Sequence, residues 1–158
     1  LKIAKTKHIG YIDADDAFNL DDIKKLIKLL DNYDVIIASK WKDTNFMDVS
    51  EPFLRRFMSR GWNLLVRILF GLKFYDTQAG AKFFRYESLK NIDKDFICKN
   101  FAFDVELLWK IKEKGYKINE VYVSTIHREG STFKMIYAFY MFNSIMRLWW
   151  KKCRRLYF

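Results

Sequence analysis

Hydrophobic and polar positions follow two different periods along the chain, and together they predict strands and helices in turn. A short apolar run over residues 8–12 ends at acidic residues. Residues 20–30 then carry apolar side chains at helical spacing behind Asn19, a residue type favoured at helix N-caps. The run from Asp34 to Ser39 is too short and too β-branched for a helix, so it predicts a buried parallel strand. A strand, a helix and a second strand in this order predict an α/β fold.

The second half of the chain continues this alternation. Pro52 suits the first turn of a long helix that runs to about Phe70, and Gly71 suits its end. The remaining predicted elements are a strand, a helix closed by a glycine and a further strand, over residues 81–85, 103–115 and 117–123. No internal repeat, low-complexity tract or obvious linker interrupts this pattern.

Composition and charge narrow the possible partners. The chain has 158 residues, 51% hydrophobic and 18% aromatic, which argues against intrinsic disorder. Its formal net charge of +10 favours an anionic partner such as phosphate, nucleic acid or an acidic membrane surface. Cys98 and Cys153 lie far apart without metal-ligand spacing, which predicts free thiols in a reducing compartment. No secretory signal opens the chain, and its first residues resemble the end of a helix, so we expect a truncated start.

Three carboxylates follow the first apolar run, in the segment "GYIDADDAF". Asp13 and Asp15 point to the same side of an extended segment, so their repulsion favours either a raised pKa or a bound cation. Mg²⁺ typically takes one or two carboxylates and completes its shell with water and substrate phosphates. Ligands of α/β sheets also bind outside the carboxyl ends of the strands. The pattern therefore favours a divalent cation bound at this position.

Other interpretations compete with the metal site. A solvated acidic turn that caps the next helix needs no function. An EF-hand calcium loop does not fit, because its fifth position is Ala17 and its sixth, which requires glycine, is Phe18. A phosphatase with an aspartyl nucleophile also has two aspartates at this spacing, but its further partners are not identifiable in the chain. Spacing alone leaves the acidic turn and the phosphatase open.

Four blocks in a fixed order resemble the inverting family-two glycosyltransferases, nearest to the polyprenyl-phosphate (dolichyl-phosphate) glucosyl- and mannosyltransferases. The blocks are "DADD", the basic helix with "DTQAG", "FAFDVELL" and "HREGST", and the resemblance extends over residues 9–132. "DTQAG" followed by "FDVELL" is more similar to the glucosyl branch. The resemblance implies a partial GT-A fold, Rossmann-like with a mostly parallel sheet. It also implies inverting transfer of a hexose from UDP-glucose or GDP-mannose to a polyprenyl phosphate.

The same blocks imply roles for the acidic residues. The resemblance implies that Asp13 faces the donor sugar and that Asp13 and Asp15 hold Mg²⁺ or Mn²⁺, a charge that stabilises the departing nucleoside diphosphate. The mannosyl branch often has glutamine where this chain has Ala17, so we expect Asp16 or water to complete the metal shell.

Two further acidic segments have both structural and functional interpretations. By itself "DTQAG" is a turn with an aspartate start and a glycine finish, and acids at the start of the following helix complement its dipole. The resemblance implies that Asp76 and Gln78 position donor or acceptor. It also implies that Asp104 or Glu106 positions a hydroxyl on the acceptor side.

A phosphate acceptor is itself an anion, so it requires cations. Arg55 and Ser59 lie one helical turn apart and can present a guanidinium and a hydroxyl to one phosphate. These positions match acceptor-phosphate residues of the family, although a solvated basic helix face explains each of them alone. Lys40 stands where the family often has arginine, so we expect it to contact phosphate but without the bidentate geometry of a guanidinium. The resemblance further implies that the loop carrying Arg128 and Ser131 closes on phosphate.

The final apolar stretch, residues 133–150, is interrupted by Lys134, Asn143 and Arg147, so it lacks the run of about 20 apolar residues that a spanning helix needs. Its aromatic residues and the following "KKCRR" suit an amphipathic helix at an anionic membrane surface, and a core-packing helix with a basic tail fits equally well. A lipid-phosphate acceptor favours the membrane, and the basic residues then favour its cytoplasmic face. We therefore expect a glycosyltransferase portion over residues 1–131 and an amphipathic membrane-interface helix with a basic tail over 132–158.

The resemblance places a βαβ portion that holds the donor's base before residue 1, so we expect these 158 residues alone to bind a nucleotide sugar poorly.

Two functions of other classes stay open. A non-catalytic, membrane-associated remnant would keep the fold without turnover. A nucleic-acid-binding module would use the basic and aromatic residues. No recognition motif for nucleic acid occurs, so we expect none as a partner.

Overall fold

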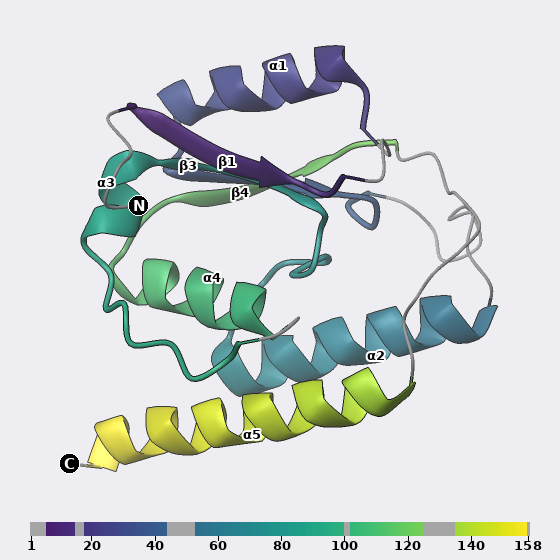
Figure 1. Cartoon of the computed structure of the whole chain (residues 1–158), viewed down its shortest axis with the longest axis vertical. Coiled ribbons are helices and arrows are strands. Elements are labelled where there is room, and N and C mark those ends of the chain that lie inside the picture. Colours follow the sequence, from purple (N-terminus) through teal and green to yellow (C-terminus); the bar gives the residue numbers. More distant parts are fainter. Residues whose placement is uncertain (1–5, 15–17, 44–52, 100–101, 125–134, 158) are drawn as a thin grey trace.

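One four-stranded sheet with helices on both faces forms the body of the molecule (Figure 1). The computed structural model describes residues 6–14, 18–43, 53–99, 102–124 and 135–157, without the side chains of residues 55, 135, 136 and 155–157. The elements in chain order are β1 (His8–Ile12), α1 (Leu20–Lys28), the 3₁₀ turn η1 (Leu29–Asp31), β2 (Val35–Ser39), α2 (Phe53–Phe70), β3 (Ala81–Arg85), α3 (Tyr86–Lys90), α4 (Phe103–Glu113), β4 (Ile118–Tyr122) and α5 (Met135–Tyr157). Apart from α3, each described element corresponds to a predicted one.

The strands are arranged in the order β1-β3-β2-β4, and only β3 runs against the other three. Because β3 lies between β1 and β2, both pair with it in antiparallel fashion, and only β2 and β4 pair in parallel. The expectation of a mostly parallel sheet is therefore wrong for the pairings, although the α/β class is confirmed. The hydrophobic pattern of the sequence indicates which strands are buried, but it does not indicate the direction in which they run.

The side chains of β2 alternate between two core clusters. Val35 and Ile37 pack with residues of α2, α4 and α5, whereas Ile36 and Ala38 pack with residues of α1. All five residues of β2 are buried, as expected for a central strand covered on both faces. Figure 1 shows the same division, with α1 on one side of the sheet and α2, α4 and α5 on the other.

The predicted helix ends have the expected local chemistry. The side chain of Asn19 accepts a hydrogen bond of 3.0 Å from the backbone N–H of Asp21, so it caps α1. Gly71 and Gly115 have φ angles of 65° and 78°, the left-handed conformation that ends α2 and α4 without a Cβ penalty. Cap and turn residues therefore predicted where α1 begins and where α2 and α4 end.

Helix α5 lies within the predicted range and continues through "KKCRR", so these basic residues are helical and do not form a separate tail. Ile145 and Leu148 are buried in the same cluster as residues of α2 and α4. The ammonium of Lys152 also donates a 2.8 Å hydrogen bond to the carbonyl of Leu69 in α2. Within the described part of the chain, none of the helices has the length and apolarity to span a bilayer.

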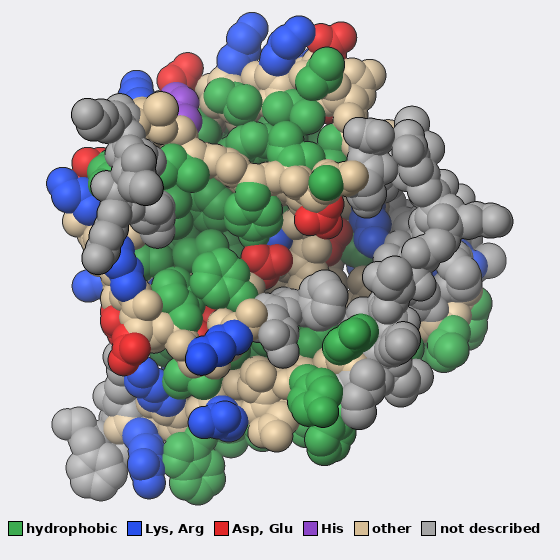
Figure 2. All heavy atoms as spheres, in the orientation of Figure 1, with side chains coloured by type: hydrophobic (Ala, Val, Ile, Leu, Met, Phe, Trp, Pro, Cys, Tyr) green, Lys and Arg blue, Asp and Glu red, His purple; other side chains and the backbone are tan. Residues whose placement is uncertain are grey.

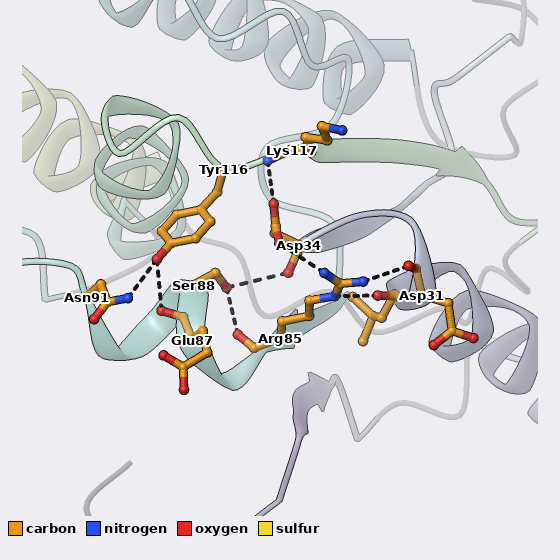
Figure 3. Close-up of polar contacts among 9 residues, drawn as sticks. Asp31, Asp34, Arg85, Glu87, Ser88, Asn91, Tyr116 and Lys117 are labelled. Carbon is orange, nitrogen blue, oxygen red and sulfur yellow. Dashed lines mark hydrogen bonds and ion pairs between the residues drawn. The ribbon is translucent and has the colours of Figure 1, made fainter.

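Asp34 ties the end of β3 to the beginnings of β2 and β4 (Figure 3). Its carboxylate accepts a 2.8 Å hydrogen bond from the N–H of Lys117 and lies 3.6 Å from a guanidinium nitrogen of Arg85. The same guanidinium donates to the carbonyls of Leu30 and Asp31 at 2.6 and 2.7 Å. These polar contacts lie at the edge of the sheet away from the acidic motif, so we assign them a structural role.

We expect the Arg85→Ala variant to lose about 1 to 3 kcal/mol of unfolding free energy, because two carbonyls and one carboxylate lose a charged donor. Urea denaturation followed by circular dichroism measures this loss. Lys90→Ala is the matched control, since its ion pair with Glu87 is 4.0 Å long and exposed. That change should alter the unfolding free energy by less than about 0.5 kcal/mol. Equal effects of the two substitutions would contradict the assigned role.

Candidate active site

Predicted site residues from three parts of the chain meet at one edge of the sheet, where β1 and β2 end. Asp13 follows β1 and Lys40 follows β2, while the turn "DTQAG" leads into the reversed strand β3 from the same edge. The backbone N–H of Asp13 donates a 2.7 Å hydrogen bond to the carbonyl of Gly80. Acidic side chains are visible beside the carboxyl end of β1 in Figure 2. The structure therefore joins the acidic motif to the "DTQAG" turn.

The carboxylate of Asp13 lies directly over Gly80. A Cβ atom at position 80 would come within 2.5 Å of Oδ2 and 2.9 Å of Cγ of Asp13. These distances are too short for any side chain, so only glycine allows the carboxylate to occupy this place. The glycine that the sequence suggests as the end of a turn thus also determines where the first aspartate lies.

Lys82, which sequence reasoning missed, connects the turn to α4. Its side chain is fully buried, and its ammonium donates to the carbonyl of Ala79 at 2.6 Å. The same ammonium pairs with Oδ2 of Asp104 at 3.0 Å. A detectable signal was present, because strand alternation in "AKFFR" places this lysine on the same face as the buried Phe84. A lysine at such a position requires a partner within the protein.

Asp104 is held by two partners. Its second oxygen, Oδ1, accepts a hydrogen bond from the hydroxyl of Tyr11, the residue two positions before Asp13. Burial and the nearby charge of Asp104 raise the pKa of the Tyr11 phenol, so this hydroxyl stays protonated and remains a donor. The structure thus brings Asp104 to the same edge as Asp13. Its predicted role toward a substrate hydroxyl stays a prediction.

The carboxyl group of Asp76 is buried at the start of the turn. Burial raises its pKa from 3.8 to about 6, and the charge of Glu120 adds to this rise. The positive charges of Lys40 and Lys82, and a hydrogen bond from the backbone of Lys40, act in the opposite direction. Asp76 and Lys40, both predicted site residues, are therefore neighbours in the structure.

Glu120 and Asn63 hold the turn in place, and neither was identified from the sequence. The carboxylate of Glu120 accepts hydrogen bonds from the backbone N–H groups of Tyr75 and Asp76 at 2.7 to 3.0 Å. The amide oxygen of Asn63 in α2 accepts from the N–H and hydroxyl of Thr77 at 3.0 and 2.8 Å. The turn that contains Gln78 is thus fixed to both β4 and α2.

Trp41 connects the predicted phosphate-binding residues. Its buried indole donates a 3.2 Å hydrogen bond to the hydroxyl of Ser59 on α2. The guanidinium of Arg60 lies 4.4 Å from the centre of the Trp41 ring, and the ammonium of Lys40 lies 5.9 Å from it. Lys40 and Ser59 therefore both lie beside the side chain of Trp41.

Several predicted site residues fall outside what the structure describes: Asp15, Asp16, Arg128, Ser131 and the side chain of Arg55. Among the described side chains, no three from His, Cys, Asp and Glu gather as a metal-binding group. The second aspartate of the expected pair is not among them. The proposed metal site therefore stays a prediction that rests on Asp13 and its sequence context.

Lys82→Met should lower the unfolding free energy by about 3 kcal/mol or more, because it leaves Asp104 and the carbonyl of Ala79 without their buried cation. Guanidinium denaturation measures the loss. Lys24→Met removes an ion pair with Asp21 whose side chains are 71% and 75% exposed, so it serves as the matched control. We expect the control to change stability by less than about 0.5 kcal/mol. A small loss at position 82 would show that the buried pair is not important for stability.

The raised pKa of Asp76 predicts a specific pH dependence. The folded state binds this proton more tightly than the unfolded state, so the stabilisation it provides is present below pH 3.8 and is lost as the pH rises through about 6. Asp76→Asn lacks this titration. The variant should therefore gain about 2 to 3 kcal/mol relative to the wild type as the pH rises across this window. Thermal unfolding at several pH values measures the difference, and a gap independent of pH would contradict the prediction.

Comparison with known proteins shows which family the chain is similar to. The family described as glycosyl transferase family 2 matches residues 1–112 of the chain. An undecaprenyl-phosphate mannosyltransferase of Micrococcus luteus is 30% identical over 125 residues, which cover 78% of this chain and 51% of that protein. A polyprenol monophosphomannose synthase of Mycolicibacterium smegmatis is 27% identical over 126 residues, covering 78% and 47%.

A third relative belongs to the glucosyl branch. A dolichyl-phosphate beta-glucosyltransferase of Trichomonas vaginalis is 28% identical over 155 residues, which cover 92% of this chain and 46% of that protein. The chain spans about half the length of these three curated relatives. Its mixed α/β sheet is consistent with part of a GT-A fold. The family match over most of the chain shows that this protein belongs to glycosyl transferase family 2.

Proposed function

We propose that the protein transfers a hexose from a nucleotide sugar to a polyprenyl phosphate, with inversion at the sugar. The observation that carries this proposal is the attachment of Asp13 to the "DTQAG" turn at Gly80, beside the buried Lys82 and Asp104. Relatives named as mannosyl- and glucosyltransferases of polyprenyl and dolichyl phosphates support the acceptor class. UDP-glucose and GDP-mannose are the donors that we propose.

The donor end of the proposal requires a divalent cation. Asp13 is exposed, and a backbone hydrogen bond fixes its position after β1. Carboxylate oxygens are ligands that Mg²⁺ and Mn²⁺ prefer. Asp15 would be the second ligand. When bound, the cation neutralises the charge that develops on the departing nucleoside diphosphate. The fixed turn around Asp76 and Gln78 would orient the sugar, since a short loop tied at both ends loses little freedom on binding.

For the acceptor, we propose that cationic side chains bind its phosphate and that no strong base is needed to deprotonate it. A phosphate monoester is already ionised near neutral pH, so its oxygen can attack the sugar without first losing a proton to the protein. Lys40 and Ser59, brought together around Trp41, would bind this phosphate, with Arg55, Arg128 and Ser131 as further ligands. Asp104, whose two oxygens contact Tyr11 and Lys82, would position a sugar hydroxyl.

The acceptor is anchored in a membrane, so the enzyme must work at its surface. We propose that α5 lies at the cytoplasmic face of an anionic membrane, with its basic residues at the level of the headgroups. The alternative is a non-catalytic, membrane-associated member of the family that keeps the fold without turnover. Metal-dependent transfer distinguishes the two.

The test is a transfer assay with the full-length protein, isolated membranes, labelled UDP-glucose or GDP-mannose, and Mg²⁺ or Mn²⁺. Asp15→Ala should reduce transfer by about 100-fold or more, because the leaving diphosphate loses much of its charge stabilisation. Asp21→Ala, at an exposed acid on α1, should leave transfer unchanged. Transfer that survives the loss of Asp15 would show that the metal assignment is wrong, and no transfer from any donor would favour the non-catalytic alternative.

Substitutions at two glycines test whether transfer depends on the position of the Asp13 carboxylate. Gly80→Ala places a methyl group within 2.5 Å of the Asp13 carboxylate and should displace it, so we expect transfer to fall at least about tenfold. Gly61→Ala is the matched control, because a Cβ at that helical position meets nothing within 4 Å. Equal activity of the two variants would show that the placement of Asp13 over Gly80 is unimportant for transfer.

A further inference from the structure

The positive charge of the chain is concentrated in two helices. The 18 residues of α2 include four arginines, the 23 residues of α5 include five lysines and arginines, and neither helix contains an acidic residue. These helices therefore contribute +9 of the formal net charge of +10, and the rest of the chain is nearly neutral. Such a concentration favours an anionic partner on the side of the molecule where both helices lie.

Helix α2 also exposes a stripe of large apolar side chains. Phe57, Leu64 and Ile68 are 64%, 57% and 72% exposed. Their spacings of seven and four residues place them on one side of the helix. The opposite side of α2 carries Val66, which packs in the core, and Ser59, which contacts Trp41 at the site. Helix α2 therefore separates the site from the exposed stripe by roughly one helix diameter, about 10 Å.

Helix α5 has the same character. Phe139, Phe142 and Trp150 are 64%, 47% and 61% exposed, although other side chains of this helix are buried in the core. The guanidinium of Arg154 lies 5.7 Å from the centre of the Trp150 ring. An exposed tryptophan beside arginine is typical of helices at a membrane interface, where the ring lies among the headgroups and the cation meets phosphate.

The two helices pack side by side. Residues of both belong to the same core cluster, and Lys152 of α5 donates to the carbonyl of Leu69 in α2. Figure 1 shows them side by side on the face of the sheet opposite α1. In the lower part of Figure 2, hydrophobic and basic side chains lie next to one another among polar ones. We call the exposed apolar and basic side chains of α2 and α5 the helix-pair face.

We propose that the helix-pair face binds the surface of an anionic lipid bilayer, with the apolar residues of α2 inserted beside those of α5. This inference deepens the proposed function, on whose lipid acceptor its purpose rests, by making α2 as well as α5 a membrane-binding element. Contiguous exposed apolar area rimmed by basic residues gains both hydrophobic and electrostatic free energy at such a surface. A second copy of the chain is a poorer occupant, because pairing two such faces would bring like charges together.

The test is co-sedimentation of the 158-residue chain with vesicles of phosphatidylcholine, with and without 30% phosphatidylglycerol as a probe of about one anionic lipid in three. We expect binding to the anionic vesicles, weakened by salt. Phe57→Ser combined with Ile68→Ser should weaken partitioning at least about tenfold, because two apolar side chains no longer enter the bilayer. Leu20→Ser is the matched control, since Leu20 is 71% exposed on α1, across the sheet from the helix-pair face.

Charge is tested in the same way. Arg147→Glu combined with Arg154→Glu should weaken binding to the anionic vesicles at least about tenfold, whereas Lys28→Glu on α1 should leave it nearly unchanged. Circular dichroism confirms that each variant is folded. Equal binding to neutral vesicles, or equal losses from the α1 and helix-pair variants, would overturn the proposal. So would light scattering that shows, without lipid, a dimer broken by the Phe57 and Ile68 substitutions.

Vesicle binding and sugar transfer can fail separately. Asp15→Ala, expected to reduce transfer by about 100-fold or more, should bind vesicles as the wild type does, because Asp15 is not part of the helix-pair face. A protein that transfers sugar but does not bind anionic vesicles would refute only the lipid-binding face. A protein that binds vesicles through α2 but transfers no sugar would refute only the proposed function.

Discussion

The insertion of β3 between β1 and β2, against their direction, is the constraint on which the arrangement of the site depends. A strand that enters the sheet at the edge where its neighbours end brings its leading turn to their carboxyl ends. The "DTQAG" turn therefore meets Asp13 through a backbone hydrogen bond. At the far edge the same strand ends at Arg85, which ties it to Asp34. Parallel pairing alone would place that turn at the wrong end of the sheet.

Burial of charge is the second consequence of this topology. Lys82 lies in β3, between β1 and β2, and its side chain is fully buried. Its ammonium therefore depends on Asp104 and a backbone carbonyl for its polar contacts. Removing a charge from water is costly, and a tight pair with an additional hydrogen bond offsets much of this cost. The buried pair also fixes the start of α4 relative to β1 and β3. The ion pair between Lys82 of β3 and Asp104 therefore helps to make this edge of the sheet rigid.

Much of the fold could be predicted from residue patterns, and the reasons are local. Asn19, Gly71 and Gly115 mark helix boundaries through cap and turn chemistry that needs no tertiary contact. The direction of β3 could not be predicted, because apolar alternation is the same for parallel and antiparallel strands. Family blocks pointed to Asp13, Asp76 and Asp104 by position. Glu120 and Asn63 were missed, since each acts on a backbone far away in sequence.

Charge placement has a kinetic consequence. Because most of the excess positive charge is carried by α2 and α5, the charge distribution has a dipole directed from α1 toward these helices. In the field of an anionic surface, a dipole rotates before contact is made, and the range of this torque is set by the Debye length, about 8 Å at physiological ionic strength. A molecule built in this way approaches such a surface already oriented, so fewer encounters are wasted on the wrong side.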